Sequence, residues 1–132
     1  MKHPKSLILI DDDEIVVYLT KKIVSQNDLV ELIKVFNNGK DAIDYLKENI
    51  NNPELLPEII FLDLFMPIMD GWEFLDEYIT IRPRIGKAIT IYIISSSVSP
   101  IDINRAKKYS EVSDYIIKPV TKSHFLDILK NL

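Results

Sequence analysis

Residues 59–75 read IIFLDLFMPIMDGWEFL, and this stretch predicts one strand, one loop and the start of one helix. Residues 59–62 are apolar at every position, which is typical of a strand covered on both faces. Asp63 ends this run, and Asp70 is placed to cap a helix that begins near Gly71. The apolar positions of that helix follow helical spacing at Trp72, Leu75 and Ile79.

The same strand-and-helix unit is repeated along the whole chain. Further apolar runs lie at residues 7–10, 32–36, 89–94 and 115–117. The stretches between and after them carry apolar residues at helical spacing: Ile15, Leu19 and Ile23; Ala42, Leu46 and Ile50; Ile103 and Ala106; and Phe125, Ile128, Leu129 and Leu132. Strand alternating with helix predicts an α/β fold, with a parallel sheet, right-handed crossovers and helices on both faces. The segments 49–57 and 82–87, which contain proline, read as exposed connections.

Composition limits the classes of protein that fit this chain. Its 132 residues support one domain, and 16 basic against 20 acidic side chains give a net charge of −4. A nucleic-acid partner is not expected, because the lysines and arginines are scattered among acids. No apolar run reaches the roughly 20 residues that cross a bilayer, so we expect no membrane association. The absence of cysteine fits a cytoplasmic protein and excludes disulfides and thiolate metal sites.

Polar side chains follow the predicted strands at the point where each one ends. Residues 11–13 are all aspartate, Asp63 follows the third strand, residues 95–97 are all serine, and Lys118 follows the fifth. In an open parallel sheet these ends meet at one edge, where ligands bind. Clustered carboxylates repel unless a cation lies among them, and oxygen ligands suit Mg²⁺. A lysine beside them can pair with phosphoryl oxygens, so the pattern indicates Mg²⁺-assisted phosphoryl chemistry with a carboxylate nucleophile.

Four motifs together resemble the receiver domain of two-component response regulators. They are LILIDDD at 7–13, IIFLDLFMPIMDGWEFL at 59–75, IYIISSS at 91–97 and YIIKP at 115–119, in the order and spacing of that family. The resemblance covers essentially the whole chain. It implies a flavodoxin-like, doubly wound sheet of five parallel strands in the order 2-1-3-4-5, with five helices, which is the strand order of a chemotaxis receiver.

The resemblance also implies a role for each residue of the site. Asp63 would accept a phosphoryl group from a phosphohistidine, and Lys118 would pair with its oxygens. Asp12 and Asp63, with the backbone carbonyl of Phe65, would bind Mg²⁺, and Asp11 would contact the ion through water. Considered without the resemblance, residues 11–13 could be a helix-capping turn, and this remains the preferred interpretation for Asp13.

A second group of residues would carry the switch. Ser95 would donate its hydroxyl to the bound phosphoryl group, and Tyr115 would turn inward when the loop after the fourth strand moves. The surface formed by the fourth helix, the fifth strand and the fifth helix would change as a result. The family also implies a cis peptide bond between Lys118 and Pro119.

The expected function is therefore a phosphoacceptor switch in a phosphorelay, with at most slow autodephosphorylation. We expect residues 1–132 to be a single receiver domain without an output domain. Its partners would be a sensor histidine kinase or a histidine phosphotransfer protein and a downstream protein target. Phosphorylation could also drive formation of a homodimer.

Three other functions remain open at this point. A phosphatase with an aspartyl-phosphate intermediate would use similar groups, but it usually needs an acid where this chain has Phe65. A nucleotide or flavin carrier would need a glycine-, serine- or threonine-rich loop where residues 11–13 are aspartates. A receiver-like docking module that is never phosphorylated is the third alternative.

Overall fold

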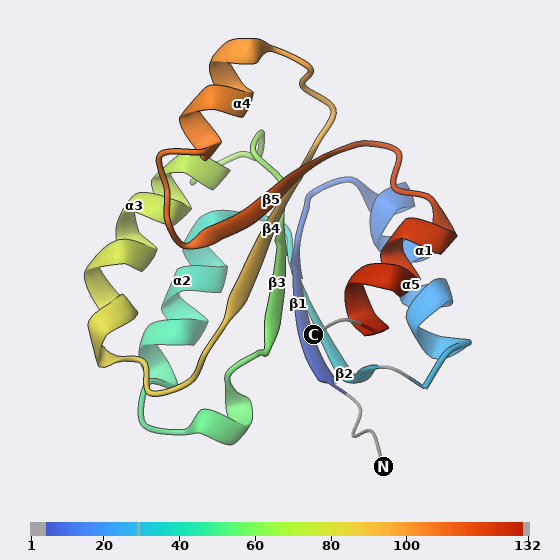
Figure 1. The fold of residues 1–132 in the computed structure, drawn as a ribbon. Helices are drawn as coiled ribbons and strands as arrows, with labels where there is room; N and C mark the ends of the chain where they lie inside the picture. Colours follow the sequence, from blue (N-terminus) through green and yellow to red (C-terminus); the bar gives the residue numbers. More distant parts are fainter. Residues whose placement is uncertain (1–4, 29, 131–132) are drawn as a thin grey trace.

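The computed structural model describes residues 5–28 and 30–130, which form one sheet with helices on both faces (Figure 1). The strands are β1 (Lys5–Ile10), β2 (Val30–Phe36), β3 (Ile59–Leu62), β4 (Thr90–Ser95) and β5 (Val112–Ile117). The helices are α1 (Glu14–Ser25), α2 (Gly39–Glu48), α3 (Gly71–Ile81), α4 (Pro100–Ala106) and α5 (Lys122–Lys130), with short 3-10 turns η1 (Pro53–Leu55) and η2 (Arg82–Arg84).

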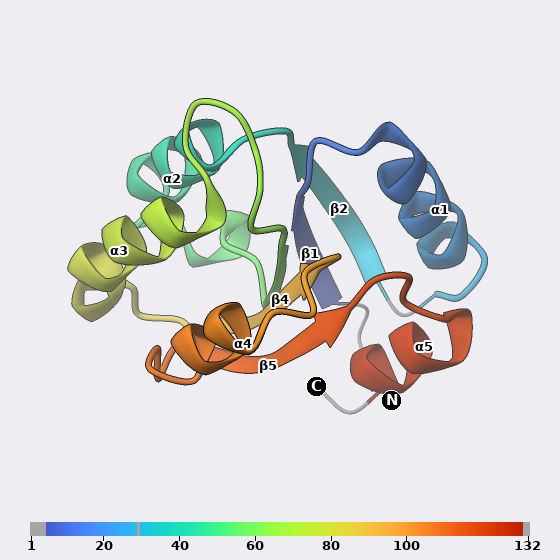
Figure 2. The same cartoon turned by 90° about the horizontal axis from the view of Figure 1, so that it is seen from above.

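The sheet has the expected topology. Its strands lie in the order β2-β1-β3-β4-β5, and every neighbouring pair is parallel. Helices α1 and α5 cover one face, while α2, α3 and α4 lie on the other, as the view from above shows (Figure 2). The prediction of a flavodoxin-like fold with order 2-1-3-4-5 is confirmed.

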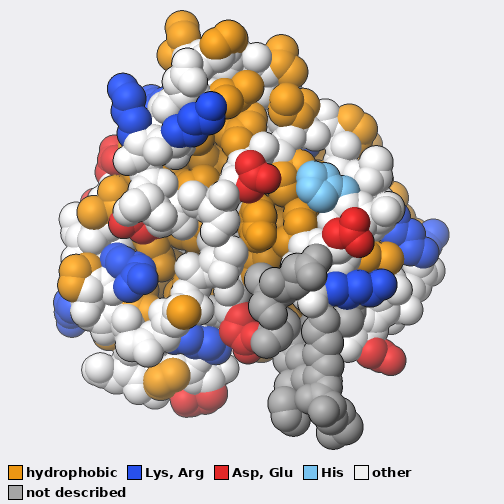
Figure 3. Space-filling model, in the orientation of Figure 1, with side chains coloured by type: hydrophobic (Ala, Val, Ile, Leu, Met, Phe, Trp, Pro, Cys, Tyr) orange, Lys and Arg blue, Asp and Glu red, His pale blue; other side chains and the backbone are white. Residues whose placement is uncertain are grey.

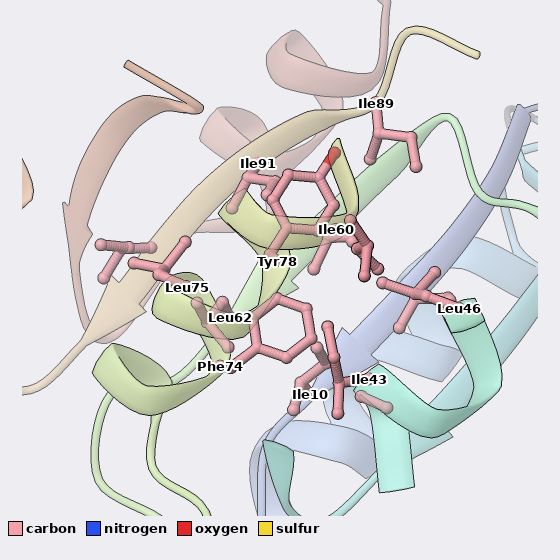
Figure 4. Packing of buried hydrophobic residues seen from close by; sticks show 14 of the residues in the cluster. Ile10, Ile43, Leu46, Ile60, Leu62, Phe74, Leu75, Tyr78, Ile89 and Ile91 are labelled. Carbon is pink, nitrogen blue, oxygen red and sulfur yellow. The ribbon is translucent and has the colours of Figure 1, made fainter. Parts of the chain in front are cut away.

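The apolar character of the central strands follows from this double cover. All four residues of β3 are buried, and they alternate between the two cores: Ile60 and Leu62 pack with α2 and α3, whereas Ile59 and Phe61 pack with α5. Figure 4 shows the first of these cores, in which the rings of Phe74 and Tyr78 lie against the strands. A strand buried on both faces has no position for a polar side chain until it ends.

Helix starts are fixed by capping side chains, as the sequence predicts. The Asp13 carboxylate accepts hydrogen bonds from the backbone at the start of α1, and Asp70 forms a capping box with Glu73 at the start of α3. Thr121 accepts a hydrogen bond from the His124 backbone at the start of α5. These caps satisfy backbone N–H groups that have no partner inside the helix.

Several element boundaries differ from the sequence prediction. Helix α2 ends at Glu48, before Ile50, and α4 is only seven residues long. The connection at 49–57 is exposed along most of its length, but Leu56 is completely buried because the chain turns back through η1 toward the core. The last apolar position of the predicted final helix, Leu132, lies outside the described residues.

The surface agrees with the scattered charge of the sequence. On the face seen in Figure 3, lysine and arginine side chains are interspersed with aspartate and glutamate. Within residues 5–28 and 30–130, none of the helices has the length and apolar character that a membrane span requires.

Candidate functional site

The candidate site lies at the edge where the strands end, which Figure 2 views from above. Backbone hydrogen bonds continue the sheet one residue beyond three of the strands. The N–H of Asp63 donates to Ile10 (2.9 Å), and the N–H of Lys118 donates to Ser95 (2.8 Å). The N–H of Asp11 donates to Phe36 (3.0 Å) in the same way. The backbone of each site residue is therefore held by the sheet, although the residues are far apart in sequence.

Three carboxylates meet at this edge. Asp11, Asp12 and Asp63 each place one carboxylate oxygen within 4.8 Å of the others. Asp11 and Asp63 are buried, with 2% and 7% of their surface exposed, whereas Asp12 is exposed to solvent. The cluster is thus open on the side of Asp12 and closed on the other.

Lys118 is the cation beside the two buried acids. Its Nζ lies 2.9 Å from Oδ2 of Asp11 and 3.6 Å from Oδ2 of Asp63. The remaining oxygens are partly satisfied by the backbone, since Oδ1 of Asp11 accepts from the N–H of Asp13 and Oδ1 of Asp63 accepts from the N–H of Leu64, both at 2.9 Å. Without a further cation the lysine favours Asp11, so Asp63 is the less compensated of the two acids.

The pKa values reflect this imbalance. Burial, followed by the repulsion from Asp11, raises the pKa of Asp63 to about 6, and the attraction of Lys118 only partly opposes this. Burial acts to lower the pKa of Lys118, but the hydrogen bond and charge of Asp11 and the charge of Asp63 together raise it above its ordinary value. Lys118 is therefore charged at neutral pH, and Asp63 stands where an additional cation would stabilise its ionised form.

The donor set fits a hard divalent cation. The three acids supply only oxygen atoms, and one of them is exposed, which leaves room for water in the coordination shell. The raised pKa of Asp63 is a second indication, because a carboxylate that lacks a full countercharge gains most from a metal ion. The side chain of Phe65, two residues after Asp63, is 54% exposed, so its ring faces solvent.

The loop between β3 and α3 approaches Asp63 very closely. A Cβ atom on Gly71 would lie 2.5 Å from the carbonyl oxygen of Asp63, so only glycine allows α3 to begin here. In the same loop, the exposed Ile68 has a φ of 68°, a left-handed conformation that costs a β-branched residue about 1–2 kcal/mol. The next residue, Met69, holds the loop by accepting a hydrogen bond from the N–H of Gly39 (2.9 Å).

The predicted switch residues lie together at the end of β4. Ser95 is completely buried, and its Oγ accepts a hydrogen bond from the N–H of Ser97 (3.1 Å). The hydroxyl of Tyr115 donates to the backbone carbonyl of Ser97 (2.9 Å), so the ring is already half-buried beside the loop. The Lys118–Pro119 peptide bond is cis.

Two features of the site were not anticipated from the sequence. A cavity of about 370 Å³ between α1 and α5 opens beside Asp11, Asp63 and Lys118, and its walls are mostly apolar. Leu19 and Ile23, two of the three residues whose helical spacing predicts an apolar face, line it together with Val16, whereas the third, Ile15, is 71% exposed. The spacing does not show that a space remains beside this face. The second feature is a hydrogen bond between the side chains of Ser97 and Asp102, and no sequence pattern pairs them.

Comparisons with known proteins point to one family. A family model described as the response regulator receiver domain matches residues 7–130. A probable methanogenesis regulatory protein, FilR2 of Methanothrix harundinacea, is 30% identical over 120 residues, which cover 91% of this chain and 76% of FilR2.

Solved structures give the same result. A two-component response regulator from Cytophaga hutchinsonii is 34% identical, with a TM-score of 0.84, and the match covers 98% of this chain and 96% of that one. The phosphorylated cyanobacterial phytochrome response regulator RcpA is 25% identical, with a TM-score of 0.76 and coverage of 97% and 90%.

Proposed function

Because the chain belongs to the response regulator receiver domain family, we propose that it is a phosphoacceptor switch in a two-component phosphorelay, with Asp63 as the acceptor. Receiver domains are in general phosphoacceptor modules rather than enzymes. The observation that carries the proposal is the position of Asp63: a buried carboxylate, with two further acids and a lysine at the same edge of the sheet.

In the proposed reaction, a carboxylate oxygen of Asp63 forms a bond to phosphorus while the bond from phosphorus to the donor histidine breaks. The electron pair of that bond returns to the imidazole nitrogen, so the carboxylate becomes an acyl phosphate. Lys118 already lies 3.6 Å from Asp63, and its ammonium group would pair with the phosphoryl oxygens.

Asp12, Asp63 and the backbone carbonyl of Phe65 would hold Mg²⁺, and Asp11 would contact the ion through water. The ion would supply the positive charge that this acidic cluster lacks when a phosphoryl group arrives. The protein itself would orient Asp63 through the hydrogen bond from the Leu64 backbone and would exclude water from the buried side of the site.

The switch would follow from the new charge on Asp63. Ser95 would donate its hydroxyl to a phosphoryl oxygen, and the loop after β4 would be drawn toward the site. Tyr115 would then turn further inward, and the surface of α4, β5 and α5 would change. A downstream protein or a second copy of the chain would recognise the altered surface.

The phosphoryl donor would be a sensor histidine kinase or a histidine phosphotransfer protein. RcpA, one of the related structures, is a phosphorylated response regulator, which supports phosphorylation of this chain as well. A phosphatase function is disfavoured, because the residue two positions after Asp63 is an exposed phenylalanine, which cannot transfer protons.

Intact-mass spectrometry tests the proposal directly. The protein is incubated with acetyl phosphate, with and without Mg²⁺, beside Asp63→Asn and the matched control Asp44→Asn, whose carboxylate is 42% exposed on α2 and pairs with Lys40. We expect one Mg²⁺-dependent phosphate on the wild type and on Asp44→Asn, and none on Asp63→Asn. A folded wild type that takes up no phosphate would instead favour the docking module, and phosphate on Asp63→Asn would show that the acceptor is another residue.

A further inference from the structure

Ser97 connects three parts of the molecule that the proposed switch must move. Its N–H donates to Oγ of Ser95 (3.1 Å), and its carbonyl accepts from the hydroxyl of Tyr115 (2.9 Å). Its own Oγ donates to Oδ2 of Asp102 (2.6 Å) and accepts from the N–H of Ser99 (3.2 Å). One loop residue therefore joins the end of β4, the start of α4 and strand β5.

Asp102 is the charged member of this arrangement. It lies in the first turn of α4 and is half-buried, and an O–H donor at 2.6 Å from a carboxylate is a short, charge-assisted hydrogen bond. Such bonds contribute more than neutral ones. The hydrogen bond between Ser97 and Asp102 is thus stronger than the neutral hydrogen bonds that Ser99 makes at the start of α4.

We propose that Asp102 is a positioning residue that holds the loop after β4 in its resting arrangement through Ser97, and thereby weakens the response of the site to a phosphoryl group. The inference rests on the proposed function. Asp102 lies on α4, outside the acidic site, and would be a further residue that sets the equilibrium between the resting and phosphorylated states.

The physical reason is the geometry of the loop. Movement of Ser95 toward Asp63 would carry Ser97, two residues further on, with it. Tyr115 would follow as it turns inward, whereas Asp102 is anchored on α4. The hydrogen bond between Ser97 and Asp102 would lengthen or break, so its strength favours the resting state. A ligand that stabilises the moved loop must overcome this preference, which lowers its apparent affinity.

Beryllofluoride, which occupies the place of a phosphoryl group on a carboxylate, tests the inference by calorimetric titration in saturating Mg²⁺. We expect Asp102→Ala and Ser97→Ala each to bind it about ten- to a hundredfold more tightly than the wild type, as loss of one charge-assisted bond implies. The double variant should bind no more tightly than either single one, because both remove the same bond. Asp102→Asn keeps an acceptor oxygen and should lie between the wild type and Asp102→Ala.

Ser99→Ala is the matched control. Ser99 caps α4 through the N–H of Ile101 (3.3 Å), so this variant loosens the start of the helix without removing the Ser97–Asp102 bond. We expect its beryllofluoride affinity to equal that of the wild type, and the Mg²⁺ affinity measured without beryllofluoride to be the same in every variant.

The outcomes separate the two proposals. Wild-type protein that binds Mg²⁺ but not beryllofluoride would overturn both the phosphoacceptor function and the role of Asp102. Normal binding by the wild type, with unchanged or weaker binding by Asp102→Ala, would overturn the role of Asp102 alone. An equal gain in Ser99→Ala would also overturn it, because the effect would then come from loosening α4.

Discussion

Replacing Asp63 by asparagine should stabilise the metal-free protein at neutral and alkaline pH. In the folded state the pKa of Asp63 is raised from 3.8 to about 6, first by burial and then by the charge of Asp11. The folded protein therefore holds the Asp63 proton more tightly than the unfolded chain does. The contribution of Asp63 to the stability of the folded state is therefore fully present below about pH 4 and is lost as the pH rises through 6. Asparagine resembles the protonated form at every pH and does not lose this contribution.

The magnitude follows from the two pKa values. The difference between 3.8 and about 6 corresponds to roughly 3 kcal/mol for a fully sealed site. The site opens to solvent beside the exposed Asp12, and screening by water reduces this to about 1–2 kcal/mol. Asp63→Asn should thus exceed the wild type by about 1–2 kcal/mol in the free energy of unfolding at pH 8, and by close to zero at pH 4.

Urea denaturation between pH 4 and 8 in the presence of EDTA measures this difference, provided that the slope with urea is the same in both proteins. Asp44→Asn serves as a control, since the Asp44 side chain is 42% exposed and pairs with Lys40 on the surface of α2. A difference between Asp63→Asn and the wild type that stays constant over this range, or an asparagine variant that is less stable at pH 8, would refute the assignment of Asp63 as an undercompensated buried acid.

Two other substitutions test different parts of the site. Lys118→Ala should leave Mg²⁺ affinity, measured by calorimetry, largely intact and weaken the response to phosphorylation, because the lysine neutralises Asp11 and faces Asp63. An unchanged response would show that the lysine takes no part in the switch. Gly71→Ala should lower the free energy of unfolding in urea by about 2–3 kcal/mol, because its Cβ would meet the Asp63 carbonyl. Gly86→Ala, with nothing within 4 Å of its Cβ, should change it by less than about 0.5 kcal/mol, and equal losses would contradict the close approach.

Much of the fold could be predicted from the sequence because the central strands β1, β3 and β4 are largely buried, whereas the edge strands β2 and β5 are more exposed. Uninterrupted apolar runs such as residues 59–62 leave little ambiguity between strand and loop, and the polar residue that follows each run marks the sheet edge. The gathering of Asp11, Asp63 and Lys118 at one edge is a direct consequence of parallel topology. The strand order itself came from the resemblance to the receiver family.

The details that could not be predicted from the sequence are those that depend on side-chain geometry. No spacing rule indicates that Lys118 lies closer to Asp11 than to Asp63, since both acids follow neighbouring strands. Helix α4 was poorly defined in the sequence because it has only seven residues, and its position depends on individual contacts rather than on an apolar face. The Ser97–Asp102 hydrogen bond could not be predicted either, because the conformation of the loop determines which hydroxyl lies beside which carboxylate.

The surroundings of Trp72 give the protein a native optical probe. This is the single tryptophan of the chain; the guanidinium carbon of Arg105 lies 4.4 Å from its ring centroid, and Tyr109 stacks on it at 5.9 Å. Trp72 is the second residue of α3 and directly follows Gly71, the glycine that lies against the Asp63 backbone, whereas Arg105 belongs to α4. Tryptophan emission should therefore respond to a change in the distance between α3 and α4 without any attached dye, and it tests whether α4 moves as proposed.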